Sequence, residues 1–295
     1  MVKTLPLLLA ALAASLSALS GSVAPAVPAT TTPVAPVVAA TTSAPVTFNP
    51  AANASDNWAG YMSDNGTYTE VGASWVVPTA AAGVQSFATD AAWIGIGGVS
   101  GRDLIQAGTE TLVQDGATEY DAWYETLPDV QHTIPLAISA GDSVSVMLSE
   151  TSPQLWHLTF KNTTTGKSYE TDIAYDSSKS SAEWIEERPL VIAGRSAGYA
   201  PLDSFGTVQF TGAYAVKDGT RTSLSDLSAE PVSMIDDALT PLASPSVVAA
   251  DGSFSVAETA DAQTQSAAPA YTITTSHRHR RHAMPGAQIE VFYGF

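Results

Sequence analysis

The residues of this chain that could do chemistry are carboxylates and an amide set among tryptophans in short strand-like segments. In the segment DAWYETLP, alternation places Asp121, Trp123 and Glu125 on one side of an extended strand. In LIQAG, Gln106 shares a side with Leu104. Isolated polar groups of this kind normally face solvent, but a polar group on a tryptophan-rich face indicates a substrate groove.

A second carboxylate-rich segment is SAEWIEERP. Alternation places Glu183 and Glu187 on one side of the strand and Glu186 on the other. Any of the three could act as a base, and an alternative is that Glu186 or Glu187 forms an ion pair with Arg188 where the strand ends.

Several other chemistries are excluded. The chain has no Cys, which rules out thiolate catalysis, a disulfide framework and sulfur-based zinc sites. It also lacks the DTG or DSG pair of aspartic peptidases, a GxSxG elbow and an HExxH motif. GIGGVSG (95–101) is glycine-rich, but no helix follows it, so we expect a turn. His132 and His157 have no Ser or Cys partner that the sequence identifies, and His157 is predicted to be structural.

These residues must be positioned by β-strands, because the apolar pattern repeats every two residues. Short alternating runs separated by Gly, Asp, Asn and Ser occur from Asn57 to about Val256, and no long helical period is present. The segment LWHLTFKNTTTGKSYETDI predicts a hairpin that turns at Asn162–Gly166. The sequence therefore predicts an all-β single domain with minimal helix, an antiparallel sandwich or barrel.

The charge balance is strongly acidic. Asp and Glu number 29 against 12 Lys and Arg, for a net charge of −17, which argues against nucleic acid as a partner. Because cations are few, acid cannot build up a large repelling positive charge on this body. The composition suits an acidic medium, although an ordinary acidic secreted protein would also fit it.

The two ends of the chain differ from its centre. Residues 1–24 read as a signal peptide, which predicts a secreted protein with no membrane segment after cleavage. Residues 25–56, rich in Ala, Pro and Thr, are expected to be a linker or short pro-segment. The body is expected over 57–258. Residues 259–295 are expected to form a low-complexity tail, in which His277–His282 is a basic cluster.

The order of seven short motifs resembles the glutamic peptidases, the eqolisin family. The motifs span about 200 residues and are NWAGY (57–61), SWVVP (74–78), AAWIGIGG (91–98), LIQAG (104–108), DAWYE (121–125), AEWIEE (182–187) and FGTVQFTGA (205–213). Each motif alone is weak, but seven in the same order are specific.

The resemblance implies a sandwich of two packed, curved antiparallel sheets, of the concanavalin A-like or jelly-roll type, with a groove on one concave face. It implies that Gln106 and Glu183 form the catalytic dyad. It also implies that Trp93, Asp121, Trp123 and Glu125 line the substrate groove. No metal or cofactor is expected.

The chemistry of such a dyad follows from its groups. A carboxylate takes a proton from water as the water attacks a peptide carbonyl, and then returns it to the leaving amine. A glutamine N–H stabilises the oxyanion without titrating. Ionisation of the base with nearby carboxyls protonated would give an acidic optimum. The sequence departs from the family pattern in two ways. Thr126 and Leu127 follow WYE, which bears on subsite preference. The usual long pro-segment is missing, which bears on activation.

Two other functions fit the same residues. Glu125 and Glu183 could be the two carboxylates of a glycosidase, with Gln106 as a sugar contact. A non-catalytic module could bind glycan or peptide on the tryptophan face. The expected partners are polypeptide substrates, and the expected state is a monomer.

Overall fold

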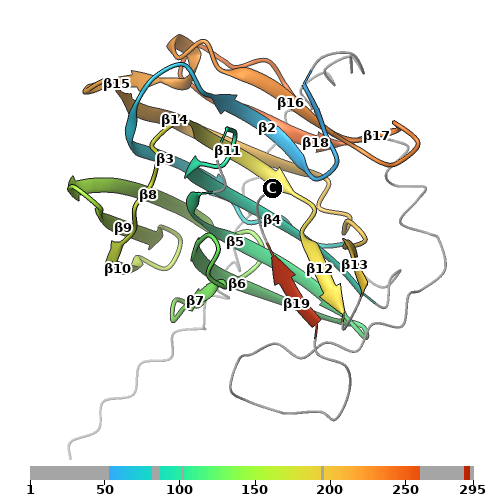
Figure 1. Ribbon diagram of the computed structural model, residues 1–295. Helices are drawn as coiled ribbons and strands as arrows, with labels where there is room; N and C mark the ends of the chain where they lie inside the picture. Colours follow the sequence, from blue (N-terminus) through green and yellow to red (C-terminus); the bar gives the residue numbers. More distant parts are fainter. Residues whose placement is uncertain (1–52, 82–86, 101–102, 194–195, 260–288, 293–295) are drawn as a thin grey trace, which may run out of the picture. The chain divides into compact units, whose positions relative to one another are not determined.

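The computed structural model describes residues 53–81, 87–100, 103–193, 196–259 and 289–292, all of which lie in the compact unit 42–295. β-Strands dominate the described residues, and one short 3₁₀ turn occurs at Leu224–Asp226 (Figure 1). The strands are β1 (Ala54–Ser55), β2 (Trp58–Ser63), β3 (Tyr68–Val76), β4 (Phe87–Gly97), β5 (Leu104–Gln114), β6 (Ala117–Thr126), β7 (His132–Ile134), β8 (Ser143–Ser152), β9 (Leu155–Asn162), β10 (Lys167–Ala174), β11 (Ala182–Glu187), β12 (Leu190–Ala193), β13 (Ser196–Tyr199), β14 (Thr207–Lys217), β15 (Thr220–Ser223), β16 (Glu230–Ile235), β17 (Pro241–Pro245), β18 (Phe254–Glu258) and β19 (Ile289–Phe292).

Two antiparallel sheets carry most of these strands. The first sheet has the order β2-β11-β4-β5-β6-β7, and the second has the order β10-β9-β8-β3-β14-β18-β17. β16 pairs with both β2 and β17, which makes the two sheets continuous along one side. A separate small sheet has the order β13-β12-β19.

The core lies between the two sheets. Alternate residues of β9 and β14 are buried, as the period of two predicts, whereas β4, β5 and β11 are buried on both faces. Trp184 from the first sheet and Trp75, Phe160 and Phe210 from the second belong to one continuous apolar cluster. Each aromatic side chain buried there contributes on the order of 2–3 kcal/mol of transfer free energy. The predicted antiparallel β-sandwich with minimal helix is confirmed, and so is the hairpin at Asn162–Gly166.

The structure differs from the sequence-based expectations at the glycine-rich segment and at the end of the chain. The glycine-rich segment is not simply a turn, because Gly95–Gly97 belong to β4, and the prediction for that part was wrong. The hydrogen bonds of β4 to its neighbours override the low strand preference of glycine. β19 lies in the segment for which the sequence predicts a tail. The expected signal peptide, most of the expected linker and the His277–His282 cluster lie outside the described residues.

Four carboxyl groups gather on the core side of the first sheet, near one end of the sandwich. They are Asp90 on β4, Glu186 on β11, Asp203 after the bridge of Leu202 to Thr89, and Glu258 at the end of β18. Burial raises the pKa of Asp90 to about 6, and repulsion from Glu110 adds to this. Burial and repulsion from Asp90 raise the pKa of Glu258 to about 7. Burial and repulsion from neighbouring carboxylates raise the pKa of Glu186 and of Asp203 well above their ordinary values.

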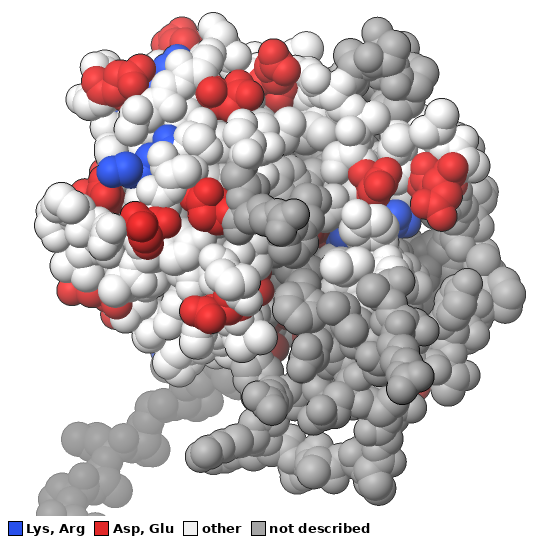
Figure 2. Space-filling view, in the orientation of Figure 1, with Lys and Arg blue, Asp and Glu red and all other residues white. Residues whose placement is uncertain are grey.

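The protein surface is acidic as well. Acidic side chains outnumber basic ones on the face seen in Figure 2.

The raised pKa values make folding stability depend on pH in one direction. The folded chain binds more protons at these four sites than the unfolded chain does, so stability falls as pH rises. The full contribution is present below the ordinary carboxyl range near pH 4. It is lost as pH rises through the values of about 6 and about 7 that Asp90 and Glu258 have in the fold.

We therefore expect the double variant Glu186→Gln/Asp203→Asn to unfold at a higher temperature than the parent chain at about pH 7. The reason is that neutral amides replace carboxyls that must otherwise ionise inside the fold. At about pH 3 the two chains should melt within a few degrees of each other. Thermal unfolding followed by circular dichroism at both pH values measures this. Parallel melting temperatures across the pH range would contradict the role of the cluster, and Asp64→Asn, an exposed carboxyl, is the control.

Candidate active site

The register of the first sheet brings four polar or small residues into one row across neighbouring strands. Glu183 of β11 lies opposite Gly95 of β4, Gly95 lies opposite Gln106 of β5, and Gln106 lies opposite Glu125 of β6. Side chains in such a row point to the same face. Glu183 and Gln106 are two strand spacings apart, about 10 Å between Cα atoms, which two long side chains can bridge. The sequence placed these residues on separate strands but could not align them.

Gln106 is held by its neighbour in the row. Its Nε2 donates a hydrogen bond to Oε2 of Glu125 at 2.8 Å, and both side chains are fully buried. The bond fixes which way the amide points, because Nε2 is the donor end. Glu125 was predicted to line the substrate groove, and in the fold it contacts the predicted catalytic amide directly.

Gly95 keeps the space between the two predicted catalytic side chains open. A Cβ atom at this position would lie 3.3 Å from Oε2 of Glu183 and 2.9 Å from both Cζ3 of Trp93 and Cδ1 of Leu104. Any side chain here would therefore press on the carboxyl or on the indole beside it. The GIGG motif carried this signal, but the sequence alone did not separate a spacer from a turn.

Glu183 is buried, and its environment favours the protonated form. Burial raises the pKa of Glu183 well above its ordinary value, and repulsion from Asp103 and Asp64 adds to this, while a hydrogen bond from Ser181 lowers it. A carboxyl that shifts this far in a tryptophan-lined site is the kind of group that exchanges protons during a reaction.

The next row of the sheet is apolar and aromatic. Trp93 of β4 and Trp123 of β6 both lie opposite Gly108 of β5 and are fully buried. They belong to an apolar cluster on this face, separate from the main core, which also contains Trp58 and Ile185. The rings of Trp58 and Trp93 meet edge to face at 5.2 Å. Both predicted groove tryptophans thus lie beside the polar row.

Glu187 anchors this aromatic row. Its Oε2 accepts a hydrogen bond from Nε1 of Trp93 at 2.8 Å, and its Oε1 accepts one from Nδ2 of Asn57 at 2.9 Å. Trp93 is thereby fixed against Gly95 and the Glu183 carboxyl. Sequence reasoning missed this contact of Asn57, although Asn57 begins the NWAGY motif.

Some predicted residues lie elsewhere. Asp121 is on the same face but pairs with Glu110, two rows beyond Glu125, so the fold does not bring it to the polar row. Glu186 faces the core. Arg188 pairs with neither Glu186 nor Glu187, because its Nη2 donates to the main-chain oxygen of Asp56 and its guanidinium lies over Tyr199.

Two of the histidines in the body lie away from the row. His132 stacks on Tyr124. His157 contacts Asp172 at 2.8 Å on the second sheet, in keeping with a structural role. Among the described residues, no group of three or more His, Asp or Glu side chains could hold a metal ion. No helix in that part of the chain is long and apolar enough to cross a bilayer.

The fold is an antiparallel β-sandwich with a row of polar side chains beside tryptophans on one outer face. Residues 56–257 match the Peptidase A4 family, and the chain belongs to this family, also called the eqolisins. It is therefore a glutamic endopeptidase, and its substrates are polypeptides.

Relatives of known name and structure agree with this assignment. The chain is 32% identical over 196 residues to aspergillopepsin-2 of Aspergillus niger, covering 58% of this chain and 68% of that protein. It is 32% identical over 184 residues to scytalidopepsin B of Scytalidium lignicola, covering 59% and 69%. The crystal structure of scytalido-glutamic peptidase with a transition-state analogue inhibitor matches with a TM-score of 0.61 at 29% identity, covering 69% of this chain and 98% of that one. Aspergilloglutamic peptidase from Aspergillus niger matches with a TM-score of 0.51 at 31% identity, covering 58% and 99%.

Gly95→Ala tests whether the space in the row matters. The added methyl group should displace Trp93 or the Glu183 carboxyl and lower kcat/KM for a peptide substrate by roughly 10–100-fold. Steady-state kinetics and a thermal melt on the same sample separate loss of activity from loss of fold. Gly198→Ala is the matched control, since a Cβ there has nothing within 4 Å. Full activity of a folded Gly95→Ala enzyme would show that the row needs no gap.

Proposed function

We propose that this chain is a secreted acid endopeptidase in which Gln106 and Glu183 form the catalytic dyad, and that pepstatin does not inhibit it. The observation that carries the proposal is the row in which these two side chains flank Gly95 on one sheet face. In this proposal Trp93 and Trp123 line the groove, Asp121 contacts more distant substrate residues, and Glu125 orients the amide of Gln106. The enzyme acts as a monomer without a cofactor.

In the proposed reaction Glu183 takes up and releases a proton, whereas Gln106 does not titrate. A peptide carbonyl lies with its carbon near Glu183 and its oxygen near Gln106. Ionised Glu183 takes a proton from the attacking water, and the N–H of Gln106 stabilises the oxyanion. The protonated Glu183 then gives the proton to the leaving amine.

The pKa of Glu183 matters both when it takes a proton from water and when it gives the proton to the leaving amine. Its raised pKa makes the protonated carboxyl the stable form in acid, which suits donation to the leaving amine. For the first step the carboxylate must be stabilised, and hydrogen bonds from water and from the bound peptide would lower the pKa again. Glu183 and Gln106 have no exposed surface, so a polypeptide reaches them only when this face opens.

The N-terminal segments are part of the proposal. Residues 1–24 act as a signal peptide and 25–56 as a linker or short pro-segment, which puts the peptidase domain of 57–258 outside the cell. The two relatives named above come from fungi, and an extracellular acid peptidase would explain the scarcity of lysine and arginine in the body.

The dyad is tested by three variants assayed on an acid-denatured protein between about pH 2 and 7 with pepstatin present. Gln106→Ala should lose about 10²–10³ in rate, because one oxyanion donor is removed. Glu183→Gln should lose all measurable turnover. Glu125→Gln should stay within about tenfold of the parent enzyme, because its amide oxygen can still accept from Gln106.

The same variants separate the other two functions. A glycosidase predicts that Glu125→Gln is as inactive as Glu183→Gln and that a glycan is hydrolysed. A binding module predicts that the parent chain binds peptide or glycan without turnover and that Gln106→Ala still binds. Pepstatin-resistant cleavage lost only with the dyad variants supports the peptidase against both.

Glu187→Gln decides between the two glutamates on the groove face. An amide at this position would turn an NH₂ group toward Nε1 of Trp93 or Nδ2 of Asn57, which both need acceptors. We expect a loss of about 1–3 kcal/mol in unfolding free energy, with substantial turnover remaining in the folded fraction. Denaturant unfolding together with active-fraction kinetics measures this. A stable but inactive Glu187→Gln enzyme would move the base from Glu183 to Glu187.

A further inference from the structure

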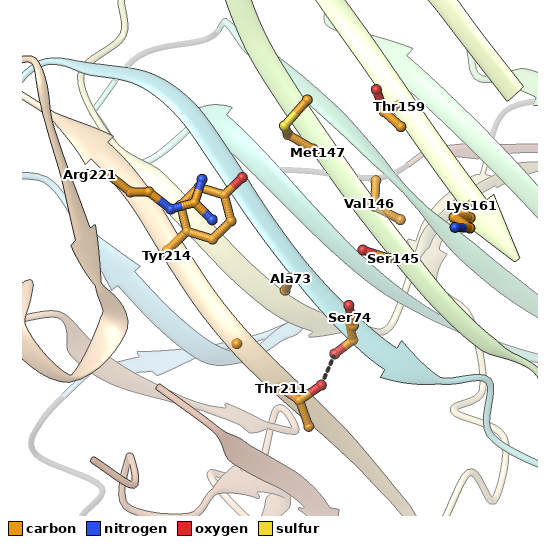
Figure 3. A pocket seen from close by; sticks show the side chains of 11 residues that line it. Ala73, Ser74, Ser145, Val146, Met147, Thr159, Lys161, Thr211, Tyr214 and Arg221 are labelled. Atoms are coloured by element: carbon orange, nitrogen blue, oxygen red, sulfur yellow. Dashed lines mark hydrogen bonds between the residues drawn. The ribbon is translucent and has the colours of Figure 1, made fainter. Parts of the chain in front are cut away.

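A cavity of about 450 Å³ lies on the outer face of the second sheet (Figure 3). Its lining residues come from β3, β8, β9, β14 and β15. Along β3, Ala73 and Trp75 face the core, so Ser74 between them faces outward. The cavity and the polar row of Glu183 thus lie on opposite outer faces of the sandwich. None of the residues of the polar row lines the cavity.

One wall of the cavity carries an arginine that stacks on an aromatic ring. The guanidinium of Arg221 stacks on the ring of Tyr214 at 3.2 Å from the centroid, and its Nη1 donates to Oε1 of Glu70 at 3.1 Å. The hydroxyl of Tyr214 donates to the same oxygen at 2.8 Å, and Ser149 donates to Oε2 of Glu70 at 3.0 Å. Arginine has five N–H donors, and the bond to Glu70 uses one of them.

The ring of Tyr214 is itself pressed onto the sheet. A Cβ on Gly72 would lie 2.5 Å from Cε1 of Tyr214, so only glycine allows this close approach. The stack of backbone, Tyr214 ring and Arg221 guanidinium limits the orientations of the cation, and 62% of the Arg221 side chain stays exposed to solvent. Such a preorganised guanidinium suits a planar or tetrahedral oxyanion.

The opposite wall carries a second cation. Figure 3 shows Lys161 across the cavity from Arg221, with Ser74 and Ser145 between them. Lys161 is exposed, and no carboxylate of the described chain pairs with it. The hydroxyls of Ser74, Ser145 and Thr159 make no hydrogen bond to other described residues. Two of the eight Lys and Arg between residues 51 and 260 therefore line one hollow with open hydroxyls.

Of the five strands that line the cavity, β3, β8, β9 and β14 have partners on both sides, whereas β15 pairs only with β14. β9 pairs with β10 and β8, β8 with β9 and β3, β3 with β8 and β14, and β14 with β3 and β18. An extended peptide is commonly bound by main-chain pairing to a free strand edge, and the four strands β3, β8, β9 and β14 offer none beneath the cavity. A ligand must instead be recognised by side-chain hydroxyls, the thioether of Met147 and the two cations. This favours a hydroxyl-rich, anionic ligand larger than a single inorganic ion.

We propose that this cavity is a binding site for a sugar chain that carries carboxylate or sulfate groups. Arg221 and Lys161 bind acidic groups at the two ends, and the hydroxyls of Ser74, Ser145 and Thr159 bind the hydroxyls of the sugars between them. The site would hold the peptidase on an acidic polysaccharide while the opposite face remains available for polypeptides.

The test uses the full-length protein at about pH 5 and low salt, titrated by calorimetry with an oligogalacturonate, a heparin oligosaccharide and a neutral oligosaccharide. We expect the acidic sugars to bind and the neutral one not to bind. The carboxylated and sulfated probes separate the two sources of charge. Lys161→Ala and Arg221→Ala should each weaken binding about tenfold or more, as expected for a lost charge-assisted hydrogen bond.

One control tests whether loss of any surface cation weakens binding, and a second tests whether the Lys161 variant stays folded. Lys167→Ala removes an exposed cation on β10, outside the cavity, and should change affinity less than threefold. Lys161→Ala should keep its melting temperature and its cleavage of an unrelated peptide. Absence of binding by both acidic probes, an equal loss in Lys167→Ala, or equally tight binding of polyglutamate would each overturn the proposal. The outcome does not depend on which residues catalyse peptide cleavage.

Discussion

The register between β11, β4, β5 and β6 is the constraint on which the site depends. It is set by backbone hydrogen bonds between segments far apart in the chain, and it aligns Glu183, Gly95, Gln106 and Glu125 in one row. Since side chains alternate between faces, a slip of one residue in β11 would bury Glu183 in the core and turn Trp184 and Glu186 outward. The apolar cluster between the sheets opposes this slip, because the slip would remove Trp184 from that cluster.

β11 therefore separates two populations of carboxyl groups that lie within six residues of one another. On one face Glu183 and Glu187 lie among tryptophans, and on the other face Glu186 lies near Asp90. Burial raises the pKa of both Glu183 and Glu186, although they face different environments. One short strand thus carries carboxyl groups with raised pKa values on both of its faces. A body with few cations tolerates this arrangement only where protons are plentiful.

The parts of this picture that the sequence predicted are those that depend on local pattern. Period-two alternation indicated which side chains of DAWYE, LIQAG and AEWIEE share a face, and the sheet confirms those faces. The order of the motifs indicated the family. Alternation does not encode pairing, however, so the gap at Gly95 and the bond from Asn57 to Glu187 could not be predicted. Local propensity predicts a turn for the glycine segment because it ignores the hydrogen bonds from neighbouring strands.

The small sheet of β13, β12 and β19 has a consequence for the timing of assembly. β12 begins three residues after the end of β11, and Val191 packs on Phe87 and Leu112 at one end of the groove face. β12 pairs with β13 on one edge and with β19 on the other. β19 lies beyond residue 257, where the match to the family ends. During translation the segments that form the polar row emerge long before β19 does. A chain that ends at Glu258 therefore contains every residue of the row but lacks the strand that pairs with one edge of β12.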